Sequence, residues 1–163
     1  MTFSLVSNSF TRPTDTTAYA SGDLVANSTT AGSVVPLEFQ VPIGNGRGCL
    51  VKQMRLQKSG TSVTNAAFIV RLYGSSPTVA NGDNGAISSN LSDFLGSASL
   101  STMTAFTDGA KSVDTLGEDA SESALIHVVA AGDNGKIYAL LSATGAYTPA
   151  SAEVFTLELV LEQ

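Results

Sequence analysis

The C-terminal stretch of the chain alternates apolar and polar side chains with a period of two. Between residues 152 and 162, one set of apolar side chains falls on a single face of an extended chain: Phe155, Leu157, Leu159 and Leu161. Most residues between them are polar or acidic. Successive side chains of a strand point to opposite sides, so this repeat belongs to a β-strand buried on one face. The stretch is predicted to be such a strand, and a chain built on this repeat folds into sheets.

The same repeat, or a run rich in β-branched and aromatic residues, predicts further strands upstream. The clearest candidates are 34–41, 49–58, 66–73, 125–130 and 136–142, with weaker ones at 3–10, 19–26 and 101–106. Pro36 favours a sheet edge or a strand start, because proline cannot donate a ladder hydrogen bond. The sequence Ala-Gly-Asp-Asn-Gly at 131–135 predicts a hairpin turn that joins the strands on either side of it.

A single short helix is expected over 90–96, where Asn90 or Ser92 can cap it and Gly96 ends it. The chain is therefore predicted to be all-β, as a single-domain jelly-roll-like β-sandwich of about eight antiparallel strands. An immunoglobulin-like sandwich is the second choice, although the sequence has no tryptophan and one cysteine, so the core groups typical of that fold are missing. The polar stretches 74–96 and 107–123 are expected to be surface loops of one domain spanning residues 1–163.

Charged residues are few and unevenly placed. They make up 13% of the chain, against about 25% in a typical soluble domain. Nucleic acid is not an expected partner, because the net charge is −6 and phosphate binding requires clustered cations. A membrane span is not expected either, since no apolar run approaches the roughly 18 residues that one needs. Basic residues prevail from 39 to 82 and acidic ones from 83 onward. This asymmetry indicates either a bipolar surface suited to docking or a solvated strand face of accidental sign.

The sequence predicts no enzyme, no catalytic residue, no cofactor and no metal site. A serine hydrolase needs a histidine oriented by a carboxylate, but His127, the only histidine, lies between Ile126 and Val128 and no Gly-x-Ser-x-Gly motif is present. Cys49 is expected to be a small buried hydrophobic residue rather than a reactive thiol. Gly-Asp-Asn-Gly occurs at 82–85 and again at 132–135. Calcium binding is the alternative for these copies, but the EF-hand spacing is missing and turn formation explains them better.

Two segments resemble a known group of proteins. Residues 10–28 read FTRPTDTTAYASGDLVANS, and residues 145–153 read GAYTPASAE. Both resemble small virion proteins of tailed bacteriophages, usually found with the head genes. The resemblance implies a capsid decoration (cement) protein with a jelly-roll fold, which binds the major capsid protein at capsomer junctions as a homotrimer. Such a protein is made in the bacterial cytoplasm and ends on the capsid surface of the virion. The alternative is a host-recognition, carbohydrate-binding β-module on a tail or fibre.

The first of these segments also predicts an N-terminal arm around residues 8–20. Pro13 fixes its own φ angle and biases Arg12 towards an extended conformation, which leaves Arg12 available to pair with a carboxylate on a neighbouring protein. A plain first loop with a turn at Asp15 and Thr16 is the alternative. The candidate contacts with the capsid or with other subunits are Arg12, Pro13, Arg47, Arg55 and Arg71.

Overall fold

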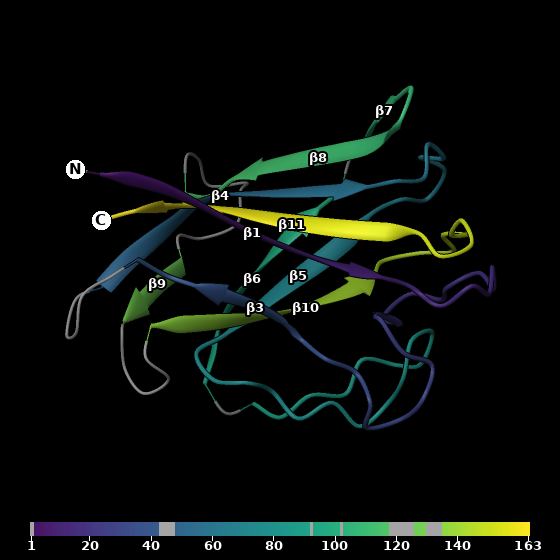
Figure 1. Ribbon diagram of the computed structural model, residues 1–163, viewed down its shortest axis with the longest axis horizontal. Helices are drawn as coiled ribbons and strands as arrows, with labels where there is room; N and C mark the ends of the chain where they lie inside the picture. Colours follow the sequence, from purple (N-terminus) through teal and green to yellow (C-terminus); the bar gives the residue numbers. More distant parts are fainter. Residues whose placement is uncertain (1, 43–47, 92, 102, 118–125, 130–134) are drawn as a thin grey trace.

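The computed structural model describes residues 2–42, 48–91, 93–101, 103–117, 126–129 and 135–163. Eleven strands and no helix are present in these ranges (Figure 1). The strands are β1 (Phe3–Thr11), β2 (Leu24–Val25), β3 (Leu37–Gln40), β4 (Gly48–Lys58), β5 (Phe68–Tyr73), β6 (Phe94–Leu100), β7 (Thr104–Phe106), β8 (Gly109–Thr115), β9 (Ile126–Val129), β10 (Lys136–Ala143) and β11 (Val154–Glu162). The all-β prediction is confirmed.

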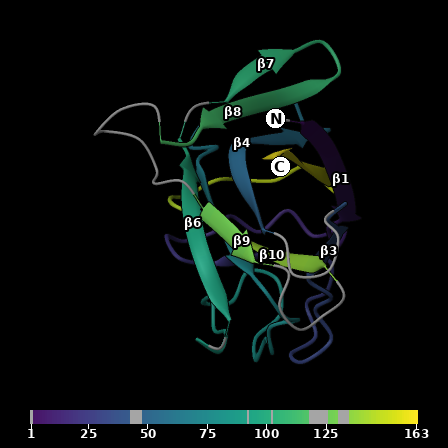
Figure 2. The same cartoon turned by 90° about the vertical axis from the view of Figure 1, so that its left-hand side faces the viewer.

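The strands form two antiparallel sheets that pack face to face. The first sheet has the order β1-β11-β4-β8-β7, and β9 pairs with β4 beyond the end of β8. The second has the order β2-β10-β5-β6, and β3 also pairs with β10. Figure 2 shows β8 near the top of the molecule and β10 well below it. The result is a sandwich of the jelly-roll-like kind that the periodicity predicted, with more strands than the expected eight or so. The strands that the sequence analysis did not predict are β6, which lies where a helix was expected, and β8, which lies in an expected loop.

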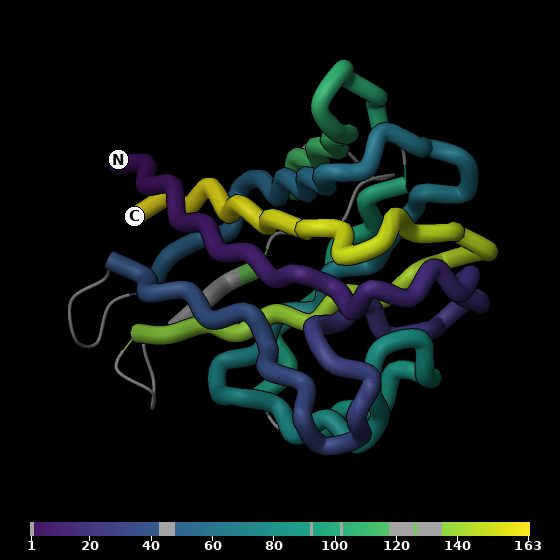
Figure 3. Tube along the Cα trace, turned by 45° about the vertical axis from the view of Figure 1, so that its right-hand side comes forward, coloured from purple at the N-terminus to yellow at the C-terminus, as the bar shows by residue number. Residues whose placement is uncertain are grey.

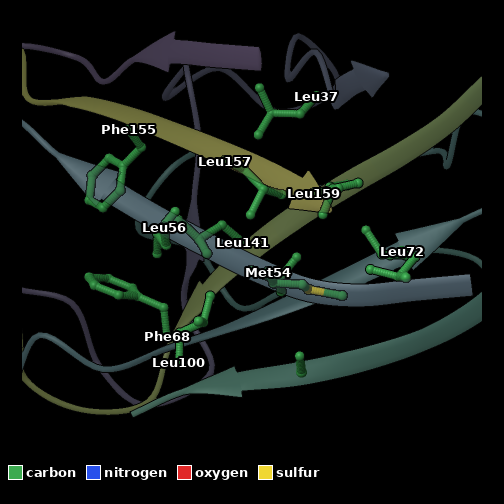
Figure 4. Close-up of a cluster of buried hydrophobic side chains, with 14 of the residues drawn as sticks. Leu37, Met54, Leu56, Phe68, Leu72, Leu100, Leu141, Phe155, Leu157 and Leu159 are labelled. Carbon is green, nitrogen blue, oxygen red and sulfur yellow. The ribbon is translucent and has the colours of Figure 1, made fainter. Parts of the chain in front are cut away.

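The main core fills the space between the two sheets. The alternating face of β11 supplies Phe155, Leu157, Leu159 and Leu161, all buried. Met54 and Leu56 of β4 lie beside them, and Phe68, Leu72 and Leu141 come from the second sheet (Figure 4). The strand with the clearest alternation in the sequence is therefore central to the core, as predicted.

A second, smaller core lies on the other side of the second sheet. Tyr73, Tyr138 and Leu140 point away from the main core and pack with Leu24, Val79 and Ile87. The last two belong to the long connection between β5 and β6, which was predicted to be a surface loop. That connection is pinned by isolated bridges between Asp23 and Ala86 and between Val79 and Ser89. The outer face of the second sheet is thus partly covered by the chain itself.

Three local predictions were wrong. The expected helix over 90–96 is absent, because Phe94 begins β6 and its ring packs against Tyr73 with centroids 5.6 Å apart. The expected polar loop 107–123 contains β8, whose small inward residues Ala110 and Ser112 gave little hydrophobic signal. The strands on either side of the predicted hairpin do not pair with each other. β9 pairs with β4 and β10 lies in the other sheet, while the turn residues 130–134 lie outside the described part.

The chain termini lie side by side at one end of the first sheet (Figure 3). Thr2 and Gln163 exchange two backbone hydrogen bonds, of 3.2 and 2.9 Å. From there β1 pairs with β11 along its whole length without a register shift. In the described ranges, no helix is long and apolar enough to cross a membrane.

Candidate functional site

A buried ion pair joins Arg12, just after β1, to Asp83 in the long β5–β6 connection. Both side chains are fully shielded from solvent, and Arg12 Nη2 lies 2.6 Å from Asp83 Oδ2. The second carboxylate oxygen of Asp83 accepts hydrogen bonds from the Tyr19 hydroxyl, at 2.8 Å, and from the Ala26 backbone N–H, at 2.7 Å. Arg12 Nε also donates to the Tyr19 hydroxyl. Asp83 therefore compensates one buried charge and two buried donors at once.

A second buried ion pair lies close by, at the end of β4 and the start of β11. Lys58 Nζ is 3.2 Å from Glu153 Oε1, and both side chains are fully shielded. The ammonium group also donates to the backbone carbonyls of Gly60 and Ser62, at 2.7 and 2.6 Å. The Tyr147 hydroxyl lies within 2.8 Å of both oxygens of Glu153. All three protons of the ammonium group thus have acceptors, as a buried lysine requires.

Two tyrosines connect these ion pairs. The rings of Tyr19 and Tyr147 are parallel to within 4°, with centroids 6.4 Å apart. The Arg12 guanidinium and the Lys58 ammonium each lie 5.0 Å from the nearer ring centroid, within cation–π range. We call the six residues the ionic network: Arg12, Tyr19, Lys58, Asp83, Tyr147 and Glu153. The two segments that carry the family resemblance, 10–28 and 145–153, meet in this network.

Burial and neighbouring charges shift the pKa of four groups in the ionic network. Burial, assisted by nearby carboxylates, raises the pKa of the Tyr19 and Tyr147 phenols far above the ordinary 10.0. Burial lowers the pKa of Lys58, and the attraction of Glu153 opposes that change. Burial also acts to lower the pKa of Arg12, but the hydrogen bond and charge of Asp83 outweigh it and the pKa is raised. Both phenols therefore stay protonated at neutral pH and donate hydrogen bonds to the carboxylates of Asp83 and Glu153.

The prediction of an N-terminal arm around residues 8–20, with Arg12 available to a neighbour, is therefore wrong. Residues up to Thr11 belong to β1, Arg12 is 2% exposed, and its charge is used inside the chain by Asp83. Arg12 is not available to a neighbouring protein. Pro13 is half-buried, and its carbonyl accepts a hydrogen bond from the Ala152 N–H at 3.3 Å. The sequence singled out the segment around Arg12 but could not identify the carboxylate that pairs with Arg12, because Asp83 lies 71 residues away.

Arg55 and Arg71 lie on opposite faces of the sandwich. Met54 and Leu56 on either side of Arg55 are buried in the core, so Arg55 points outward from the first sheet. Val70 and Leu72 are buried in the same core, so Arg71 points outward from the second sheet, where it donates to the Ser142 hydroxyl at 2.6 Å. A flat partner can contact one of these arginines but not both. Arg47 lies outside the described residues.

The outer face of the first sheet combines an ion-pair ladder with exposed apolar side chains. Glu158 Oε2 lies 3.0 Å from Lys111 Nζ and 3.9 Å from Arg55 Nη1. Val113, directly opposite Arg55 in the sheet register, is 54% exposed, and Phe106 at the edge is 56% exposed. We call these five residues the open face. Arg55 is the one predicted contact residue that this face contains.

Two other candidates of the sequence, Cys49 and the first Gly-Asp-Asn-Gly copy, behave as a packing residue and a turn. Cys49 is 2% exposed and burial raises the pKa of its thiol, as expected for a buried hydrophobic residue. His127 pairs with Leu50 in the β4–β9 ladder. Asn84 adopts a positive φ of 62° in the first Gly-Asp-Asn-Gly copy, which is a turn as predicted. The prediction missed that the same turn presents Asp83 to Arg12. The second copy lies mostly outside the described residues.

Comparison with known proteins identifies no family for this chain. No family model matches the sequence, and no curated protein matches it. Among solved structures, one match is a chain in the structure of a marine algae virus of the order Picornavirales. It shares 12% identity, with a TM-score of 0.25, and the alignment covers 96% of this chain and 67% of that one. A superposition this loose carries no argument, and the fold rests on the chain's own strand pairing.

Proposed function

We propose that this protein is a structural component of a bacteriophage virion, a decoration protein that docks its open face onto the shell formed by the major capsid protein. It works by contact and not by catalysis. The resemblance of residues 10–28 and 145–153 to tailed-phage virion proteins supports the class of function. The ionic network uses Arg12, Tyr19, Tyr147 and Glu153 of these segments to hold the fold together, which leaves docking to other residues.

The observation that carries the choice of surface is the difference between the two outer sheet faces. The second sheet is partly covered by the β5–β6 connection, through Val79 and Ile87. The first sheet has no comparable apolar cluster over its outer side in the described part of the chain, and Val113 and Phe106 stay exposed there. Exposed apolar side chains grouped with polar ones are typical of protein contact surfaces.

The chemistry of the open face suits a protein partner. Lys111 and Arg55 share the single carboxylate of Glu158, so the cations are not fully neutralised and can pair with acids on the shell. Val113 and Phe106 lose contact with water on docking, which supplies affinity. Surface ion pairs contribute little by themselves, so the apolar side chains are expected to dominate binding.

The test is binding of the purified protein to expanded heads that lack decoration, followed by measurement of head stability to heat. Val113→Asp introduces a charge into the open face and is expected to weaken binding by about tenfold or more. Val63→Asp is the matched control, because Val63 is also exposed, at 40%, but lies in the β4–β5 loop. The control is expected to bind like the wild-type protein and to protect the heads equally.

Three results would overturn parts of the proposal. Wild-type protein that neither binds the heads nor stabilises them removes the decoration function. Equal weakening by both valine variants removes the open face as the docking surface. Binding to host cells or surface polysaccharide, without binding to heads, favours the tail or fibre module instead. The homotrimer implied by the resemblance is part of the same proposal and is tested by the solution mass of the protein.

A further inference from the structure

A small pocket lies on the outer face of the second sheet, where the β5–β6 connection meets the two strands that it joins. We call it the Arg71 pocket. It has an open volume of about 130 Å³ and is lined by Arg71, Tyr73, Ser89, Asn90, Leu91 and Phe94. The Val79–Ser89 bridge shapes the connection, and the hydrogen bond between the Tyr73 and Ser89 hydroxyls, at 2.7 Å, fastens it to β5. The chain's own contacts therefore build the pocket.

Arg71 gives the pocket a positive charge that no acid in the described part of the chain neutralises. The other described lysines and arginines all form ion pairs within the chain: Arg12, Lys52, Arg55, Lys58, Lys111 and Lys136. Asp93, the acid nearest to the pocket in sequence, accepts a hydrogen bond from the Ser75 hydroxyl instead, at 2.6 Å. The Arg71 side chain makes one hydrogen bond among the described residues, from Nη1 to the Ser142 hydroxyl at 2.6 Å. Most N–H donors of the guanidinium are therefore available to a ligand.

The other walls of the pocket combine a hydrogen-bond donor with flat apolar surface. Asn90 Oδ1 accepts from the Thr78 backbone N–H at 3.0 Å, which fixes the amide and leaves its NH₂ group without a partner among the described residues. The rings of Tyr73 and Phe94 meet at 62°. Phe94 is 45% exposed and Leu91 is 89% exposed, so apolar surface is accessible to a ligand. A hollow in which a cation, an amide donor and an aromatic wall converge is typical of a ligand-binding site.

We propose that the Arg71 pocket binds an acidic sugar, a uronic acid unit of a polysaccharide. The guanidinium pairs with the sugar carboxylate through parallel N–H donors, the geometry that arginine offers and lysine does not. The Asn90 NH₂ group donates to a ring hydroxyl. The C–H groups of the sugar ring pack against the exposed ring of Phe94, which removes apolar surface from water.

The size and position of the pocket favour a sugar over a protein segment. An open volume of about 130 Å³ has room for one ring but not for a strand or a helix, and a docked protein buries a broad surface rather than one small hollow. Arg71 points outward from the second sheet, on the opposite side of the sandwich from the open face. On a decorated head the pocket faces the medium, a step that rests on the proposed function, and there host polysaccharide is within reach.

The test is titration of the isotope-labelled full chain with methyl β-D-glucuronide, followed by the NMR shifts of its backbone amides. Methyl β-D-glucoside is the matched ligand, because it has the same ring without the carboxylate. The wild-type protein is expected to bind the glucuronide about tenfold more tightly than the glucoside. The shifts are expected at Arg71, Asn90 and Phe94.

Three variants separate the roles of charge and ring. Arg71→Gln keeps an amide donor but removes the charge, so it is expected to bind both glycosides equally weakly. Lys136→Gln is its matched control, because it removes one positive charge from the same sheet at a residue that does not line the pocket, and it is expected to bind like the wild type. Phe94→Leu removes the flat ring and is expected to weaken binding of both glycosides by about threefold or more. Unchanged thermal midpoints show that the variants are folded.

Four results would overturn the proposal. They are no binding of either glycoside, equal affinity of the wild-type protein for both, a glucuronide preference that survives in Arg71→Gln, and a preference that Lys136→Gln also removes. N-acetylaspartate amide is titrated as a carboxylate of the protein kind. Tighter binding of this compound than of the glucuronide overturns the choice of a sugar and assigns the pocket to an acidic side chain. No heads are present in these titrations, so their outcome is independent of the decoration function.

Discussion

Replacing Asp83 by asparagine removes one charge from the ionic network and keeps the shape of the side chain. In the native protein the carboxylate faces Arg12 Nη2 at 2.6 Å and accepts from Tyr19 and Ala26. Asparagine can still accept on one side, but its NH₂ group must then face either a guanidinium or the other donors. The Arg12 charge stays buried, because its side chain is fully shielded, and the carboxylate that remains near it, Asp15 Oδ1, is farther away at 3.7 Å and 37% exposed.

The expected cost follows from that burial. Breaking a buried ion pair by neutralising one partner costs about 3–5 kcal/mol, since an uncompensated charge stays in a poorly solvated site. A domain of this size has a total folding free energy of about 5–15 kcal/mol. Asp83→Asn is therefore expected to remain folded in mild conditions but to unfold at a much lower denaturant concentration.

The assay is urea unfolding of the variant beside a matched control, Glu158→Gln. The control makes the same acid-to-amide change in an ion pair of the open face, where the Glu158 side chain is 20% exposed. Partly exposed pairs of this kind contribute about 0–1 kcal/mol. If the free energy of unfolding falls equally in both variants, the ionic network does not stabilise the fold by compensating a buried charge. A double variant, Arg12→Met with Asp83→Asn, is expected to cost less than the sum of the single changes.

Two further predictions concern the same end of the sandwich. Gly60→Ala is expected to destabilise the fold by about 2 kcal/mol or more, because the added methyl group would collide with Glu153 Oε1 and displace it from Lys58. Gly145→Ala is the control and should be neutral, since its methyl group meets no atom within 4 Å. Equal thermal midpoints of the two variants would contradict this prediction. Above pH 10 the unfolded chain releases the Tyr19 proton while the folded chain retains it, so stability falls as the pH rises. The free energy of unfolding of Tyr19→Phe, measured by urea unfolding, should fall less steeply above pH 10 than that of the wild-type protein. The same pH dependence in both proteins would refute the raised pKa of Tyr19. The lowered pKa of Lys58 acts in the opposite direction, but it does so in both proteins.

Much of the fold was predictable from local patterns. The alternation of Phe155 to Leu161 identified a strand that became a central element of the core. Pro36 marked the start of β3, because a missing N–H restricts where a strand can begin. Cys49 was predicted to be buried, and it is. These features depend on residues close together in sequence, where periodicity and backbone chemistry act directly.

The candidate site was only partly predictable. The sequence placed Arg12 on a free arm and treated Asp83 as a turn residue, and neither interpretation identifies the ion pair between them. The prediction of a hairpin between β9 and β10 was wrong for a related reason. An Asn-Gly turn favours a tight reversal, but it does not determine whether the two strands join one sheet or separate sheets. That choice depends on which β4 residues remain unpaired beyond β8, a property of the assembled sheet.

By itself, the sequence determined the class of fold and the strand that anchors the core, because both depend on which side chains alternate along an extended chain. It also determined the scarcity of charge, which follows from composition alone. Only the tertiary structure decided which charges are buried and which sheet face stays open. The physical reason is that burial and ion pairing depend on partners far apart in the sequence, such as Lys58 and Glu153, which are 95 residues apart, and no local pattern encodes such a partner.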